Sequence, residues 1–167
     1  VVLREAEPED AESMIAYLRQ TAAETHFMVR LPEEVDFTLE EEERILRNIW
    51  KSDKDLMLAA FDGDRVVGNV GVHIFHDRTK VRHRSSLGIA IIQEYCSSGL
   101  GTILMERGID FAKKAGFEQL ELGVFADNDR ALRLYKKMGF EEIGRIPRAF
   151  RLPDGSYIDE ITMVKML

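Results

Sequence analysis

The sequence has few features that would cross-link it or anchor it in a membrane. Its single cysteine, Cys96, cannot form an internal disulfide, which fits a reducing compartment. No apolar run approaches the roughly 20 residues that a membrane-spanning helix needs. Residues 1–5 show no basic segment leading into an apolar stretch, as a secretory signal would have. We therefore expect a cytoplasmic protein that has no membrane as a partner.

Positive charge is also scarce. Lysine and arginine total 23 against 30 acidic residues, a net charge of -7. Faces that bind a nucleic-acid backbone are normally basic, so neither DNA nor RNA is expected as a partner. An acidic chain fits a cationic acceptor such as an amine, and it fits plain solubility equally well. The acidic run 40–43 is interpreted as the solvated first turn of a helix, where negative side chains suit the helix dipole.

Metal ligands are not grouped in the sequence. His73 and His76 are three residues apart on an expected strand, so their side chains should point to opposite faces, which argues against a shared metal. The histidines are interpreted as structural or exposed. Cys96 has no histidine near it in the sequence, which disfavours a role as a covalent nucleophile. No metal site is expected.

The length and the order of elements indicate one α/β domain. No repeat, low-complexity tract or linker divides the 167 residues, so a single domain over 1–167 is expected. A capping box at Thr38 and Glu41 predicts the start of the second helix. Apolar spacing and turn signals predict strands at 2–4, 56–61, 66–74, 81–92, 119–125, from 140 onward and at 157–165, and helices at 8–22, from 39 onward, at 99–115 and at 128–138. The order β-α-α-β-β-β-α-β-α-β-β predicts a mixed sheet covered by helices, because its β-α-β pieces must run parallel.

The segment 91–102 carries the clearest chemical signal. It reads as a strand, a short polar loop and the start of an amphipathic helix, so several backbone N–H groups lack a helical partner at the positive end of a helix dipole. Gly99 and Gly101 would let a bulky anion approach the backbone closely. The pattern predicts a phosphate or pyrophosphate cradle. A P-loop would need a lysine directly after Gly101, and the dinucleotide fingerprint would need a glycine in place of Leu104.

Two stretches resemble one known family. The letters CSSGLG at 96–101 resemble the Arg/Gln-x-x-Gly-x-Gly/Ala motif of the GCN5-related N-acetyltransferases, the GNAT superfamily. Residues 120–140 resemble the second half of that family's cofactor-binding core, and the resemblance covers essentially the whole chain. It implies an α/β fold with a mixed, mostly antiparallel seven-stranded sheet and helices on both faces. It also implies an acetyl-CoA-dependent N-acetyltransferase.

The resemblance further implies which residues hold acetyl-CoA, the acetyl donor. The pantetheine amides would pair with the strand end at Ile91 and Ile92, and Asn128 would contact the cofactor. Tyr135 lies seven residues beyond Asn128 on the same helical face, and it would act as the general acid that protonates the leaving thiolate. The other interpretation of Tyr135 is a core aromatic with a solvated hydroxyl. The pyrophosphate would take backbone N–H groups from Ser97, Ser98, Gly99, Leu100, Gly101 and Thr102.

Three positions depart from the family pattern. Cys96 stands where relatives usually have arginine or glutamine. Ser86 and Gly123 stand where many relatives carry a catalytic glutamate. The general base is therefore open among Glu24, His83, Ser86 and Glu160.

The acceptor is less well defined than the donor. Its pocket is expected between the irregular segment 26–37 and the hairpin 145–159, which are this chain's own additions to the family core. One hypothesis is direct transfer to a primary amine of a small molecule or of a protein N-terminus. The alternative is a non-catalytic acetyl-CoA-binding sensor or interaction module of the same fold. A homodimer stays open.

Overall fold

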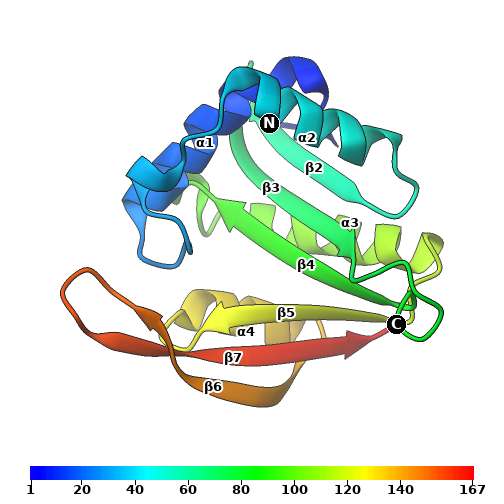
Figure 1. The fold of residues 1–167 in the computed structure, drawn as a ribbon, viewed down its shortest axis with the longest axis vertical. Helices are drawn as coiled ribbons and strands as arrows, with labels where there is room; N and C mark the ends of the chain where they lie inside the picture. Colours follow the sequence, from blue (N-terminus) through cyan, green and yellow to red (C-terminus); the bar gives the residue numbers. More distant parts are fainter.

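One sheet organises the chain, and its seven strands follow the order β1-β2-β3-β4-β5-β7-β6 (Figure 1). The computed structural model describes residues 1–167. The strands are β1 (Val2–Glu5), β2 (Leu56–Asp62), β3 (Arg65–Ile74), β4 (Arg84–Ile91), β5 (Gln119–Phe125), β6 (Glu141–Arg151) and β7 (Tyr157–Met166). The α-helices are α1 (Ala11–Glu24), α2 (Leu39–Lys51), α3 (Leu100–Lys114) and α4 (Asp129–Lys137). The order of elements predicted from the sequence is confirmed.

Helices cover both faces of the sheet. On one face, the Tyr17 hydroxyl of α1 lies 2.6 Å from Asn69 Oδ1 of β3. On the other face, α3 packs so closely that a methyl group on Gly108 would lie 3.0 Å from Val70. Strand β3 is therefore enclosed between two helical layers, and most of its residues are buried. None of the helices has the length and apolar character needed to span a bilayer.

Helix α2 begins as the capping box predicted. Thr38 Oγ1 accepts from the Glu41 amide at 3.1 Å, and Glu41 returns a bond to the Thr38 amide at 3.0 Å. The prediction that the acidic run 40–43 is solvated is wrong at Glu42, which is only 4% exposed. Glu42 lies one turn before the fully buried Leu46, so both are on the inner face of α2. Burial raises the pKa of the Glu42 carboxyl, although the positive charge of Arg30 opposes this.

One strand begins later than the sequence pattern predicted. A strand was expected from residue 81, but β4 starts at Arg84. The segment before it forms turns, because the amide of Val81 donates to Arg78 O at 2.9 Å and that of Arg84 to Val81 O at 3.0 Å. Those amides are therefore not available to a sheet ladder.

The centre of the sheet opens between β4 and β5. These parallel strands pair only over Arg84–Ser86 and Gln119–Glu121, and beyond Ser86 they separate (Figure 1). The Arg84 guanidinium holds the Glu121 carboxylate through two bonds of 2.6 Å at the closed end. This ion pair joins the two halves of the sheet where the opening starts.

Candidate active site

Backbone groups line both edges of the opening. The Ile92 amide donates to Val67 O at 3.0 Å, and that of Phe75 donates to Arg84 O. Because antiparallel bonding alternates along a strand, the odd-numbered residues Ile89 and Ile91 turn their N–H and C=O groups away from β3 and towards β5. On the opposite edge, the bond from Ala126 N to Asp159 O fixes the same alternation. Gly123 therefore turns its backbone groups towards β4.

The predicted cradle follows β4 directly. Backbone N–H groups of six consecutive residues donate to no protein acceptor: Ser97, Ser98, Gly99, Leu100, Gly101 and Thr102. Gly99 is the N-cap of α3 with φ of 87°, and Ser97 has φ of 62°. These left-handed residues turn the loop so that its amides accumulate at the positive end of a 15-residue helix. The arrangement is suited to bind a large anion.

A cavity of about 890 Å³ fills the opening between the strands. Of the residues expected to bind acetyl-CoA or to act as the general acid, three line it, namely Ile91, Asn128 and Tyr135. The cradle lies beside the cavity, because a methyl group on Gly101 would lie 3.5 Å from the Ile91 side chain and 3.2 Å from that of Leu134. Ile92 lies outside the cavity. Its side chain is fully buried, its amide donates to Val67, and its carbonyl accepts from Tyr95.

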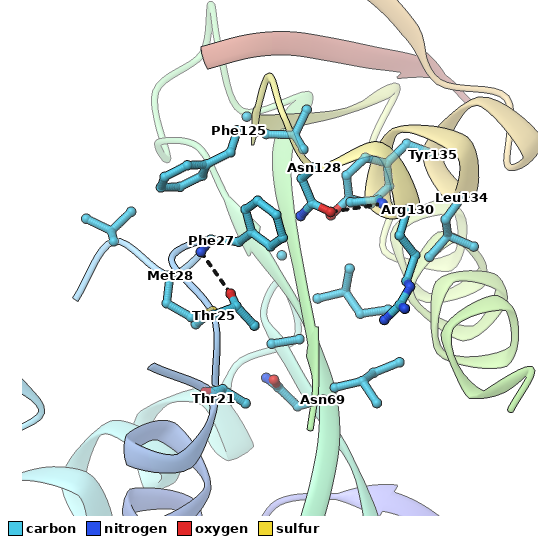
Figure 2. A pocket seen from close by; sticks show the side chains of 18 of the residues that line it. Thr21, Thr25, Phe27, Met28, Asn69, Phe125, Asn128, Arg130, Leu134 and Tyr135 are labelled. Carbon is cyan, nitrogen blue, oxygen red and sulfur yellow. Dashed lines mark hydrogen bonds between the residues drawn. The ribbon is translucent and has the colours of Figure 1, made fainter. Parts of the chain in front are cut away.

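Asn128 sits at the start of α4 and serves as its N-cap. Its Oδ1 accepts from the Ala131 amide at 3.2 Å (Figure 2). Its Nδ2 has no partner in the protein and remains available on the cavity side. The same residue therefore begins the helix and offers a donor to a ligand.

Tyr135 lies two turns further along α4 and is 7% exposed. Its ring packs near Phe140, with ring centroids 6.0 Å apart. The hydroxyl makes no hydrogen bond to the protein, while the residue lines the cavity beside Asn128 (Figure 2). Burial raises the pKa of Tyr135 to about 12, so the hydroxyl keeps its proton throughout the neutral range. A proton donor thus faces the cavity without a competing acceptor.

The far wall of the cavity is aromatic. Phe125 stacks on Phe150 with ring centroids 3.6 Å apart, and Phe27 meets Phe125 edge-on at 6.0 Å. His26 Nε2 lies 2.7 Å from Asp127 Oδ2, which ties the segment after α1 to the loop before α4. The irregular segment 26–37 and the hairpin 145–159, which were expected to form the acceptor pocket, therefore both contribute to the lining.

The candidate bases separate in the structure. Glu24 lines the cavity, but its oxygens already accept from Gln20 Nε2 at 2.8 Å and from the Gln93 amide at 2.7 Å. His83 and Ser86 are not part of the lining, whereas Glu160 is. No group of three or more His, Cys, Asp or Glu residues is arranged to hold a metal ion.

Sequence reasoning missed Asn69, which lines the cavity, and Tyr17, which bonds to it from outside the lining. Tyr17 and Asn69 are 52 positions apart, so no local pattern links them. Burial raises the pKa of Tyr17, whose hydroxyl lies 2.8 Å from the Ala90 carbonyl and fixes α1 against β4. Arg130 and Arg133 also line the cavity, and neither forms an ion pair. Their spacing on the helix after Asn128 was a signal that could have been used.

Comparison with known proteins identifies the family. Residues 14–140 match the model of the Acetyltransferase (GNAT) family. An acetyltransferase of the GNAT family from Streptococcus pneumoniae has a TM-score of 0.94 and 34% identity, with 99% of each chain covered. The L-amino acid N-acetyltransferase AaaT of Escherichia coli is 31% identical over 66% of this chain and 67% of its own. A putative acetyltransferase from Salmonella typhimurium, solved with its cofactor acetyl-CoA, shares the fold with a TM-score of 0.85 at 17% identity, over 99% of this chain and 93% of that one.

The chain belongs to the GNAT acetyltransferase family. It is an acetyl-CoA-dependent N-acetyltransferase, and acetyl-CoA is its acetyl donor. The residues present fit that molecule. Free amides at the start of α3 suit a pyrophosphate, the unpaired Arg130 and Arg133 supply positive charge, and the free backbone edges at Ile89 and Ile91 suit the amides of pantetheine.

Proposed function

We propose that residues 1–167 act as one domain that transfers an acetyl group directly to a primary amine of a small molecule or a protein N-terminus. The observation that carries the proposal is the Tyr135 hydroxyl, which faces the cavity without a protein partner. Acetyl-CoA supplies the activated acetyl group as a thioester. The neutral amine nitrogen bonds to the acetyl carbon, the carbon–sulfur bond breaks, and the departing thiolate takes the Tyr135 proton. The proton that the nitrogen loses passes through water and restores the Tyr135 hydroxyl.

The other residues hold the reactants. The amides of residues 97–102 bind the pyrophosphate, and Asn128 Nδ2 donates to the pantetheine arm. Pairing with pantetheine falls to Ile91 and, in place of Ile92, to Ile89, because both direct backbone groups into the opening. A backbone N–H in this opening also polarises the acetyl carbonyl. Cys96 contributes little, since its amide already donates to Gln93 O.

Cofactor binding is tested through thermal stability. At 100 times the dissociation constant, acetyl-CoA should stabilise the fold by about 2.7 kcal/mol, whereas NAD and ATP should not. Gly99→Ala should abolish most of this shift, because φ of 87° strains any side chain in the cradle. Gly155→Ala is the matched control, with the same φ of 87° in the β6–β7 hairpin and outside the cavity lining. It should lower the melting temperature and leave the acetyl-CoA shift intact.

Catalysis is tested by thiol release. Free CoA is measured from acetyl-CoA with a panel of amino acids, alkylamines, aralkylamines and short peptides. Amine-dependent release supports the enzyme. A full thermal shift with no thiol release from any amine would instead support the non-catalytic sensor. In favour of that alternative, Ser86 and Gly123 stand where many relatives carry a catalytic glutamate.

A further inference from the structure

Three glycines form one row across the open part of the sheet. Gly71 of β3 pairs with Gly88 of β4. Ser86 pairs with Glu121 of β5, and the two strands run parallel. Gly88 and Gly123, each two residues further along its strand, therefore lie at the same height in the sheet. Their neighbours Val70 and Leu87 point at α3, so the glycines lie on the opposite face. This row is the floor of the cavity beneath the aromatic wall.

Side chains cover two of the three glycines. His73 Nε2 lies 3.1 Å from the position that a methyl group on Gly71 would take. The Glu160 carboxyl carbon lies 2.8 Å from the corresponding position on Gly123, and its oxygens lie at 2.9 and 3.1 Å. Nothing lies within 4 Å of that position on Gly88. Open space over Gly88 is therefore flanked by a carboxylate.

The Glu160 carboxylate has no protein partner. It makes no hydrogen bond and no ion pair, although its neighbour Asp159 binds Arg145 at 2.7 Å. Glu160 lies opposite Phe125 in the sheet, so its charge stands next to the stacked rings of Phe125 and Phe150. A half-buried carboxylate beside an apolar surface is incompletely solvated, and a cation that donates hydrogen bonds to it stabilises its charge strongly.

We propose that Glu160 binds the ammonium group of the acceptor over Gly88, and that the acceptor carries an apolar or aromatic group next to its amine. The inference rests on the proposed function and specifies its acceptor. Glu160 fills, from β7, the space that a side chain at position 123 would need. Gly123 is therefore required as the residue that leaves room for this carboxylate, and the aromatic wall receives the apolar part of the acceptor.

The test uses calorimetry with 2-phenylethylamine on the protein saturated with CoA, so that no turnover is needed. Glu160→Gln keeps the shape of the side chain and removes its charge. We expect this variant to bind the amine about 10- to 100-fold more weakly and to bind CoA with an affinity within about twofold of the wild-type value. Binding of the neutral 2-phenylethanol should not change between the two proteins. Glu141→Gln, which removes an exposed carboxylate from the same hairpin, is the matched control.

Two further variants test the placement of the carboxylate. Gly123→Ala should weaken amine binding, because the added methyl group displaces Glu160. The double variant Gly123→Glu, Glu160→Ala returns a carboxylate to the same space and should recover a large part of the loss. Amine affinity within about twofold of wild type in Glu160→Gln, or no amine binding by the wild-type protein, would overturn the inference.

The result also separates this inference from the proposed function. Amine binding that depends on Glu160 without thiol release would leave the inference standing and refute acetyl transfer. Normal thiol release by Glu160→Gln, with an unchanged KM for the amine, would support acetyl transfer and refute the inference about Glu160.

Discussion

The two halves of the sheet differ in how they are packed. On the N-terminal side, β3 lies between α1 and α3 and most of its residues are buried. On the C-terminal side, every residue of β6 except Phe150 is exposed, including Ile143 at 65%. The enclosed half and α3 supply the apolar burial that stabilises the fold. The C-terminal side, called the open half below, supplies Asn128, Tyr135 and Glu160. The groups assigned to chemistry and acceptor binding therefore come mainly from the half with less core.

Tyr135→Phe gives the largest expected effect and tests the open half. Turnover at saturating acetyl-CoA should fall about 10²- to 10⁴-fold, or roughly 3–5 kcal/mol of barrier, because a positioned acid is lost. Stability and acetyl-CoA affinity should change little, since the ring still packs near Phe140. Tyr157→Phe removes a hydroxyl from an exposed tyrosine of β7 and is the control. More than about half of wild-type turnover, when chemistry limits the rate, would show that another group protonates the thiolate.

The difference in packing is tested by a pair of truncations. Leu104 of α3 is fully buried, so Leu104→Ala should cost about 2–5 kcal/mol of unfolding free energy through lost transfer energy and a cavity. Ile143→Ala on β6 should cost less than about 1 kcal/mol. Chemical denaturation measures both. Equal losses would contradict the assignment of stability to the enclosed half.

The cap of α2 has a smaller effect. Thr38→Ala removes the acceptor for the Glu41 amide and should cost about 1 kcal/mol. Thr38→Ser keeps a hydroxyl and should restore most of it. Because no residue of α2 lines the cavity, neither variant should alter acetyl-CoA affinity at a temperature where the protein is folded.

The weakest expected effect is at the junction of the halves. The Arg84 guanidinium holds the pKa of the Glu121 carboxyl below its usual range, mainly through side-chain hydrogen bonding. A lowered pKa contributes stability above the ordinary value near 4.5, and this contribution is lost as the pH falls through the folded value. Between pH 6 and pH 3 the melting temperature of the wild-type protein should therefore fall further than that of Glu121→Gln. The difference between the two decreases should be on the order of a few degrees at most. Parallel curves would show that the pair is thermodynamically silent.

Local patterns predicted most of the elements. The capping box at Thr38 and Glu41, and the glycine at Gly116 that ends α3 with φ of 86°, act over a few residues and can be read from the chain. The cradle was predictable for the same reason, because its amides are left free by the start of a helix.

Contacts between distant residues could not be predicted. The position of Glu160 over Gly123 depends on the register of β7 against β5, and no local spacing encodes that register. The burial of Glu42 depends on which face of α2 meets the core. The turn at 81–84 was hidden because Val81 has a side chain typical of strands, while the backbone of this segment bonds to itself.

The separation of β4 from β5 also has a consequence for amide hydrogen exchange. The N–H groups of Ile89 and Ile91 belong to a central strand, yet β5 accepts neither of them. They should exchange as quickly as the amides of an edge strand, while Ile92, one residue away and bonded to Val67, should be protected. A ligand that bonds to the opening would act as a missing strand. Acetyl-CoA should therefore slow exchange at Ile89 and Ile91 and leave the already slow amide of Ile92 unchanged.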